Sequence, residues 1–255
     1  MINMKDSRSD LRDILDTWKY EEGNNIRRIA TPEGREVLQV RLPLGVEQYE
    51  LDGRPDGLRP SEAESWYHYY RRQARETPWN FSLDEDSLDR LRQECMLYYH
   101  RYLLFFQISE YKLCARDTQR NLKVLDFASK YGNPTVAENL EQYRPYIIRM
   151  HVMAKALDRI QDEGEVSHAM SHLKQGMDAI EDLPLLEKNP IFQLEKTRSL
   201  RSLDDLYRQL ENHLPKTRTD VLREELHNAI TKENYEEAAR IRDKLSDLAE
   251  EPKAE

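Results

Sequence analysis

Apolar residues recur with a helical period over most of this chain, whereas one early stretch alternates with the period of a strand. From about residue 61 onward, apolar positions follow one another at three- and four-residue steps, as on the buried face of an α-helix. Earlier, Leu38, Val40 and Leu42 alternate with polar neighbours, which is typical of a half-buried strand. The pattern predicts a mainly α protein of the α+β class, with a helical-repeat or bundle body and a small N-terminal antiparallel β meander.

Residues 1–60 are expected to hold one short helix followed by this meander. An apolar face over residues 9–20 predicts the helix. Strands are predicted at 26–29, 36–42 and 46–51, because turn-forming proline and glycine residues stand between them. We therefore expect three strands joined in chain order.

Helices are predicted to fill residues 61–200. Ser61 with Glu64, and Ser82 with Glu85, have the spacing of capping boxes, so each pair predicts a helix start. Gly132-Asn133-Pro134 is interpreted as a stop, and residues 183–190, which end in Asn189-Pro190, as a connector. The expected helices after the second start run to Phe106 and then over 111–131, about 141–161, 166–182 and 202–213.

A short motif recurs three times in the chain. Glu110-Tyr111-x2-Cys114, Glu165-Val166-x2-Ala169 and Asn234-Tyr235-x2-Ala238 each place a turn before a large residue and a small residue one helical turn later. A small residue there lets a second helix come close, which loosely resembles tetratricopeptide-like helix pairs, although the usual Trp and Gly-Tyr landmarks are missing. We expect stacked helix pairs.

The C-terminal segment, residues 201–255, contains a predicted helical hairpin at about 218–250. Its first helix carries one apolar stripe, and its second helix carries the a/d seam of a coiled coil. Residues 231–234 form a polar break, and Asn234 is placed to cap the second helix. The apolar positions are Leu222, Leu226, Ala229, Ile230, Ala238, Ile241, Leu245 and Leu248.

This hairpin resembles the UVR motif, which ends the excinuclease subunit UvrB, sits within UvrC, and occurs in stress-response adaptors and some Clp ATPases. The resemblance rests on Glu233-Asn-Tyr-Glu-Glu-Ala-Ala-x-Ile-Arg-Asp243, since a generic amphipathic hairpin requires neither the two alanines nor the Arg-Asp pair. The run 34–57 also resembles the front part of bacterial proteins that end in a UVR motif. The resemblance implies a docking device that pairs with a second such hairpin, on a partner or on a second copy of the chain.

Elementary packing also favours docking, because a hairpin of roughly 30 residues buries too little surface to be stable alone. It must pack either on its own chain, closing the helical domain, or on another chain. We expect a small contact, below the standard interface of roughly 1,600 Å², with rim charges that set its register. The expected partner-binding residues are Leu226, Ile230, Glu233, Tyr235, Ala238, Ala239, Ile241, Arg242, Asp243 and Leu245.

Composition narrows the function further. The chain has 255 residues, of which 8 are glycine, and a formal net charge of −9, so neither glycine-rich phosphate loops nor nonspecific DNA binding is favoured. Cys95 and Cys114 lie in apolar contexts and fit reduced core thiols. Because there is no apolar run of about 20 residues and no signal-peptide core, we expect a cytoplasmic protein without a membrane partner.

Catalytic chemistry finds little support, and we expect no enzyme, no cofactor and no metal. The chain contains neither a Gly-x4-Gly-Lys loop for ATP nor a Gly-Ile-Tyr nuclease signature, and its cysteines cannot form the paired Cys-x2-Cys zinc sites of some UVR adaptors. His168 and His172 are four residues apart, but no further ligand stands at motif spacing, so a solvated pair is expected.

Three functions therefore stay open. The first is a non-enzymatic interaction protein that docks through the hairpin, in DNA repair or in a stress response. The second is a DNA-repair accessory that contacts DNA through Arg71, Arg72 and Arg75 or through residues 196–201. The third is an enzyme with an aromatic-lined pocket, although the aromatic residues of 66–70 and 98–106 stand at a spacing more typical of a core.

Overall fold

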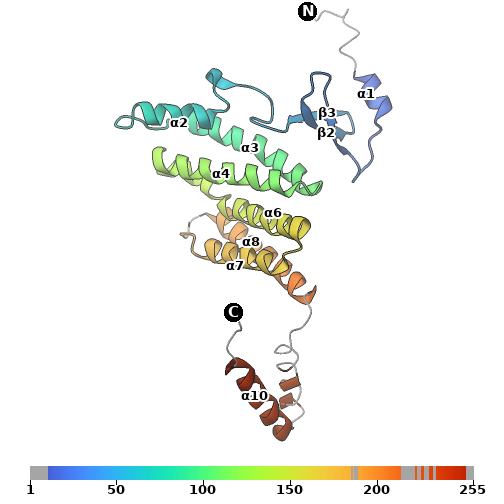
Figure 1. Ribbon diagram of the computed structural model, residues 1–255. Helices are drawn as coiled ribbons and strands as arrows, with labels where there is room; N and C mark the ends of the chain where they lie inside the picture. Colours follow the sequence, from blue (N-terminus) through green and yellow to red (C-terminus); the bar gives the residue numbers. More distant parts are fainter. Residues whose placement is uncertain are drawn as a thin grey trace, which may run out of the picture. The chain divides into compact units, whose positions relative to one another are not determined.

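The structure is a computed structural model that describes residues 11–184, 186, 189–213, 222, 225–226, 230–231 and 234–250. At 136, 163, 213, 238, 243 and 245–250 it describes the backbone alone. The chain divides into two compact units, the first ending at Tyr207 and the second beginning at Arg208. The described part is mainly helical with one small antiparallel sheet, so the predicted fold class is confirmed (Figure 1).

The N-terminal part of the first unit holds α1 (Arg12–Thr17) and a three-stranded sheet. The strands β1 (Ile26–Ala30), β2 (Glu36–Leu42) and β3 (Gly45–Glu50) pair antiparallel in the order β1-β2-β3. The meander and its three strands are thus confirmed. Within the described residues, α1 is shorter than the predicted helix and has no buried residue.

The middle strand β2 is buried on both faces, so the expectation of a half-buried strand is wrong. Leu38 is fully buried in a core cluster with Tyr102 of α3. On the other face, the buried Gln39 side chain accepts a hydrogen bond from Arg27 Nε (2.9 Å) and donates one to Gln48 Oε1 (2.9 Å). This polar face can be buried because its side chains form hydrogen bonds with one another across the strands.

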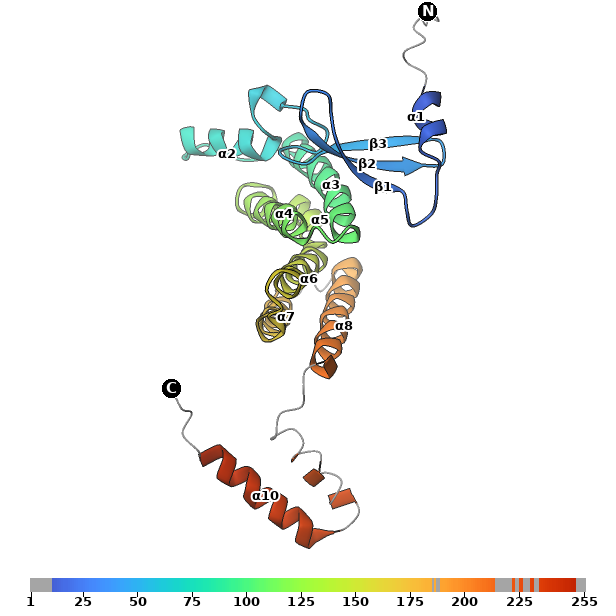
Figure 2. The same cartoon turned by 45° about the vertical axis from the view of Figure 1, so that its right-hand side comes forward.

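The helical body of the first unit is a stack. Figure 1 shows α3, α4, α6 and α7 lying one upon the next in chain order, and Figure 2 shows α8 running beside α6 and α7. α8 touches α6 where Ser202 Oγ lies 3.8 Å from Met153 Sδ. The helices are α2 (Trp66–Glu76), α3 (Glu85–Gln107), α4 (Tyr111–Tyr131), α5 (Pro134–Glu141), α6 (Arg144–Glu163), α7 (Val166–Glu181) and α8 (Pro190–His213).

The recurring motif acts as predicted in two of its three places. Cys114 in α4 and Ala169 in α7 are both fully buried, one turn after helix starts at Tyr111 and Val166. Small side chains at these points let α4 pack closely against α3 and α6, and α7 against α6. The side chain of Ala238, in the third copy, lies outside the described residues.

Two predicted helix starts are displaced. Ser65, and not Ser61, caps α2, because its side chain accepts a hydrogen bond from His68 N. Asp84, and not Ser82, caps α3, because Asp84 Oδ1 accepts a hydrogen bond from Ser87 N at 2.8 Å. The helices themselves are present, and α5 is an additional helix that the sequence pattern did not predict.

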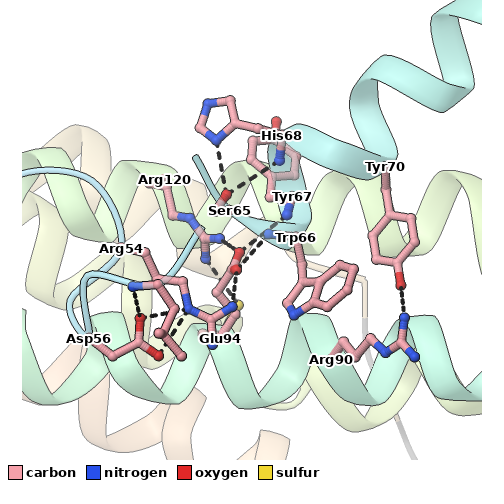
Figure 3. A network of polar contacts seen from close by, with 12 residues as sticks. Arg54, Asp56, Ser65, Trp66, Tyr67, His68, Tyr70, Arg90, Glu94 and Arg120 are labelled. Atoms are coloured by element: carbon pink, nitrogen blue, oxygen red, sulfur yellow. Dashed lines mark hydrogen bonds and ion pairs between the residues drawn. The ribbon is translucent and has the colours of Figure 1, made fainter. Parts of the chain in front are cut away.

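A buried carboxylate joins four segments of the first unit (Figure 3). Glu94 of α3 is fully buried and accepts hydrogen bonds from the backbone N–H groups of Trp66 (2.7 Å) and Tyr67 (3.2 Å) at the start of α2. The same carboxylate pairs with Arg54 (3.3 Å), from the loop after the sheet, and with Arg120 of α4. The negative charge thereby satisfies the open N–H groups at the positive end of α2.

A second buried ion pair ties the sheet to the helices. Arg101 of α3 and Asp117 of α4 are each about 1% exposed, and the guanidinium bonds both carboxylate oxygens at 2.7 and 3.0 Å. Arg101 Nη1 also donates to the carbonyl oxygen of Glu50, the last residue of β3, at 2.6 Å. Arg101 thus bonds both a carboxylate of α4 and a carbonyl group of β3. Through these bonds it links the sheet to the helical stack.

Candidate functional site

The second unit contains the predicted docking hairpin, and its second helix is α10 (Tyr235–Glu250). Asn234 caps α10 as predicted, since Asn234 Oδ1 accepts a hydrogen bond from Glu237 N at 3.4 Å. Glu237 also lies 3.7 Å from Arg240, one turn further on. Glu236 and Glu237, in the first turn, suit the positive end of the helix dipole, whereas the last turn has no basic residue. The short helical pieces before α10 lie beside it in Figure 1.

Two faces of α10 differ in their exposure to solvent. Ile241 is 3% exposed, whereas Tyr235 is 69% exposed, and Ala239 and Arg242 are also exposed. At about 100° per residue, positions 235, 239 and 242 form one stripe, and position 241 lies roughly a third of a turn away. One face of the helix is therefore covered, and the adjoining face presents an aromatic ring, a small residue and a cation to solvent.

The first helix of the hairpin shows the same division. Leu222 is 9% exposed and Leu226 is half-buried, whereas Ile230 is 52% exposed. One exposed large apolar side chain therefore stands on each side of the turn, Ile230 before it and Tyr235 after it. The predicted contact residue Glu233 lies outside the described residues, as do the side chains of Ala238, Asp243 and Leu245.

The other candidates from the sequence give no metal or nucleophile site. Among the residues that the structure describes, no group of three or more His, Cys, Asp and Glu side chains is arranged to hold a metal ion. His168 is exposed, with Nδ1 2.6 Å from a carboxylate oxygen of Glu165. Cys95 and Cys114 are free and buried, and burial raises the pKa of each thiol to about 12, so both stay protonated at neutral pH.

Two hollows in the first unit are lined in part by the aromatic segments 98–106 and 66–70, for which the sequence leaves both a core and a pocket open. The first is a cavity of about 280 Å³ among α3, α4, α6 and α8, lined mostly by apolar and aromatic side chains. The second is an open groove of about 310 Å³ between α2 and α4. The aromatic residues that line them have the spacing of a core, and many are indeed buried there. Helical spacing therefore gave no signal that separates a core position from a position at the edge of a cavity.

Comparison with known proteins gives one family match, which lies within the second unit. The family model of the UvrB/uvrC motif matches residues 216–251. This match confirms the resemblance predicted for the hairpin. No curated protein and no solved structure matches the chain. Within the part of the chain that the structure describes, no helix is long and apolar enough to cross a membrane.

Proposed function

We propose that this protein is a non-enzymatic interaction protein that docks onto a partner through its C-terminal hairpin, in DNA repair or in a stress response. The observation that carries the proposal is the match of residues 216–251 to the UvrB/uvrC motif. The matched residues lie within the second compact unit, so the motif is separable from the helical stack. A unit this small buries little apolar surface of its own. Packing against the surface of a partner would therefore supply much of its stability.

The exposed side chains support a role in contact. Ile230 and Tyr235 are large apolar residues that face solvent on both sides of the hairpin turn. Aromatic residues are enriched in protein interfaces because they bury a large area with few rotatable bonds. Ala239, one turn after Tyr235, keeps the stripe flat enough for a second helix to lie against it.

The charge pattern of α10 favours a second hairpin of the same kind as the partner. Glu236 and Glu237 stand in the first turn, and Arg242 and Lys244 follow about two turns later. If two such helices pair antiparallel about Ala239, Glu236 of each lies level with Arg242 of the other. Such rim pairs set the orientation and the rate of association more than the final affinity.

A capture experiment tests the proposal. The full chain is compared with a version that ends at His213, using as bait the immobilised full chain or another full-length protein with a UvrB/uvrC motif. The full chain should bind, and the shortened chain should not. Equal binding of both would remove the hairpin from the interaction.

A matched pair of variants at one position tests the surface itself. Ala239→Arg places a long charged side chain on the exposed stripe, and we expect it to weaken capture at least tenfold. Ala239→Ser keeps a small side chain there and should bind within about twofold of the unchanged chain. Far-UV circular dichroism checks that both variants keep the helical signal. Equal binding by Arg and Ser variants would show that this stripe is not the contact.

The groove between α2 and α4 supports direct DNA contact as a second candidate. Its lining includes Arg71, Arg75, Lys123 and Lys130, with aromatic side chains among them. Clustered cations with nearby rings suit a phosphate backbone. Retention on DNA that falls steeply with salt, and is lost in Arg75→Glu, would support this function. Passage through a DNA column at low salt without delay would exclude it.

A further inference from the structure

The cavity of about 280 Å³ in the first unit has the shape and lining of a small-molecule site. Tyr99 and Tyr102 of α3, Leu125 of α4 and Tyr146 of α6 are among the side chains around it. The exposed lining is mostly apolar, and the volume is close to the lower end of known ligand pockets. All of the lining residues belong to the first unit, so the cavity does not involve the docking hairpin.

One polar atom at this cavity lacks a partner. Tyr102 is fully buried, and its hydroxyl group makes no hydrogen bond to the described residues. Burial raises the pKa of the Tyr102 hydroxyl group. Tyr102 itself lines the cavity, together with Tyr99, Tyr146 and Cys95. A buried hydroxyl group without a partner costs free energy, and a bound molecule with an acceptor atom would remove that cost.

The charges around the cavity favour a neutral ligand. One arginine, Arg92, and one carboxylate, Glu195, line it. Arg92 bonds Asp89 of its own helix at 3.1 Å and is 53% exposed, while Glu195 lies 3.9 Å from Arg198. Arg92 and Glu195 each lie near an opposite charge, although the Glu195 side chain is only 18% exposed. Among the lining residues, the cavity therefore offers a charged ligand no unmatched ion.

We propose that this cavity binds a neutral, flat and mostly apolar small molecule whose hydrogen-bond acceptor takes the proton of the Tyr102 hydroxyl group. Tyr99 and Tyr146 are half-buried at the cavity, so part of each ring is accessible to such a molecule. The hydroxyl group orients the molecule by its acceptor end.

The test uses the full chain and prodan, a neutral naphthalene ketone whose fluorescence depends on its surroundings. Prodan is small enough for the cavity, and its carbonyl oxygen is the acceptor that Tyr102 requires. We expect saturable one-to-one binding with a blue shift of the emission. In Tyr102→Phe the Kd should rise about fivefold, the factor that one hydrogen bond typically contributes. The emission of that complex should move further to the blue, because the carbonyl group loses its donor.

A matched pair of tryptophan variants locates the binding. Met96 lines the cavity and is 46% exposed, whereas Leu194 of α8 is 48% exposed and lies outside the lining. Met96→Trp should fill the cavity and abolish saturable binding, and Leu194→Trp should bind prodan as the unchanged chain does. Both sites are partly exposed, so neither variant should unfold the protein.

Three results would overturn the proposal. The first is the absence of saturable binding to the unchanged chain, which would mean that the cavity holds only water. The second is unchanged binding by Met96→Trp, which would place the dye elsewhere. The third is an unchanged Kd for Tyr102→Phe with intact circular dichroism, which would remove the hydroxyl group as the anchor. None of these results bears on the docking hairpin, whose own test fails or succeeds separately.

Discussion

The carboxylate of Glu94 holds together parts of the first unit that are distant in the sequence. Glu94→Ala would leave the guanidinium of Arg120, whose side chain is 12% exposed, without its carboxylate. Two backbone N–H groups at the start of α2 would also lose their acceptor. We expect the free energy of unfolding to fall by about 3–5 kcal/mol, as when one partner of a buried pair is removed. Urea unfolding followed by circular dichroism measures this loss.

An exposed glutamate gives the control for this experiment. Glu64 has a side chain that is 54% exposed and lies 3.9 Å from His68. Glu64→Ala should change the free energy of unfolding by less than about 0.5 kcal/mol. If Glu94→Ala cost no more than this control, the network in Figure 3 would not be what fixes α2 to the stack.

At the scale of elements, two Asn-Pro pairs explain why the sequence pattern does not predict α5 or the first part of α8. The pattern predicts a helix stop at Gly132-Asn133-Pro134, which the end of α4 at Tyr131 confirms, and a connector up to Asn189-Pro190. In the structure each pair begins a helix: Asn133 caps α5, and Asn189 Oδ1 accepts hydrogen bonds from Ile191 N (3.1 Å) and Phe192 N (3.0 Å). Proline suits the first helical position, because its missing N–H would have no partner there. The same dipeptide ends one element and starts the next, and spacing alone does not decide between these roles.

The displaced helix caps have a tertiary cause. Leu83 N donates to the carbonyl oxygen of Tyr131 at 2.8 Å, so residues 82–83 are held extended beside Gly132 and α3 cannot begin before Asp84. Similarly, the Glu94 carboxylate accepts hydrogen bonds from the backbone N–H groups of Trp66 and Tyr67, which favours a helix that begins at Trp66. Both helix starts depend on residues at least 27 positions away in the chain, as the Tyr67–Glu94 bond illustrates. Local sequence predicted that helices exist here, but it could not fix their first residues.

Close packing of α6 and α7 gives a prediction at the scale of elements. A methyl group at Gly176 would lie 2.6 Å from both methyl carbons of Val152. In an open helix, Gly→Ala gains about 1 kcal/mol, but Gly176→Ala should lose about 1–3 kcal/mol because of the clash. Adding Val152→Ala should make the double variant more stable than Gly176→Ala, as measured by urea unfolding. A gain in stability from Gly176→Ala alone would contradict close packing at this point.

At the scale of the whole molecule, the sequence predicted the motif of the site but not its exposed surface. The motif was recognisable because its alanines and charged residues stand at fixed positions, and the match to residues 216–251 bears this out. Which side chains face solvent depends on how the helices of the hairpin turn toward each other. The sequence predicts that Ile241 and Tyr235 share one contact surface, yet the first is buried and the second is exposed. Whether they contact a partner stays a prediction.

The two-unit division predicts two separable unfolding transitions. The three tryptophans, Trp18, Trp66 and Trp79, all lie in the first unit, so tryptophan fluorescence reports on that unit, whereas far-UV circular dichroism reports on all helices. The fluorescence midpoint should be the same in the full chain and in a chain that ends at His213. The full chain should show an additional loss of helical signal at lower denaturant, because a hairpin of this size has little stability of its own.

The protein concentration then distinguishes docking from closure of the helical domain. If the hairpin pairs with a second copy, its transition should move to higher denaturant as the concentration rises, since association stabilises the folded form by mass action. A partner hairpin added in excess should produce the same shift. If the hairpin instead closes the helical stack, shortening the chain would remove buried contacts and lower the fluorescence midpoint at every concentration. That result would make the hairpin a structural part of the first unit and would refute its role as a docking element.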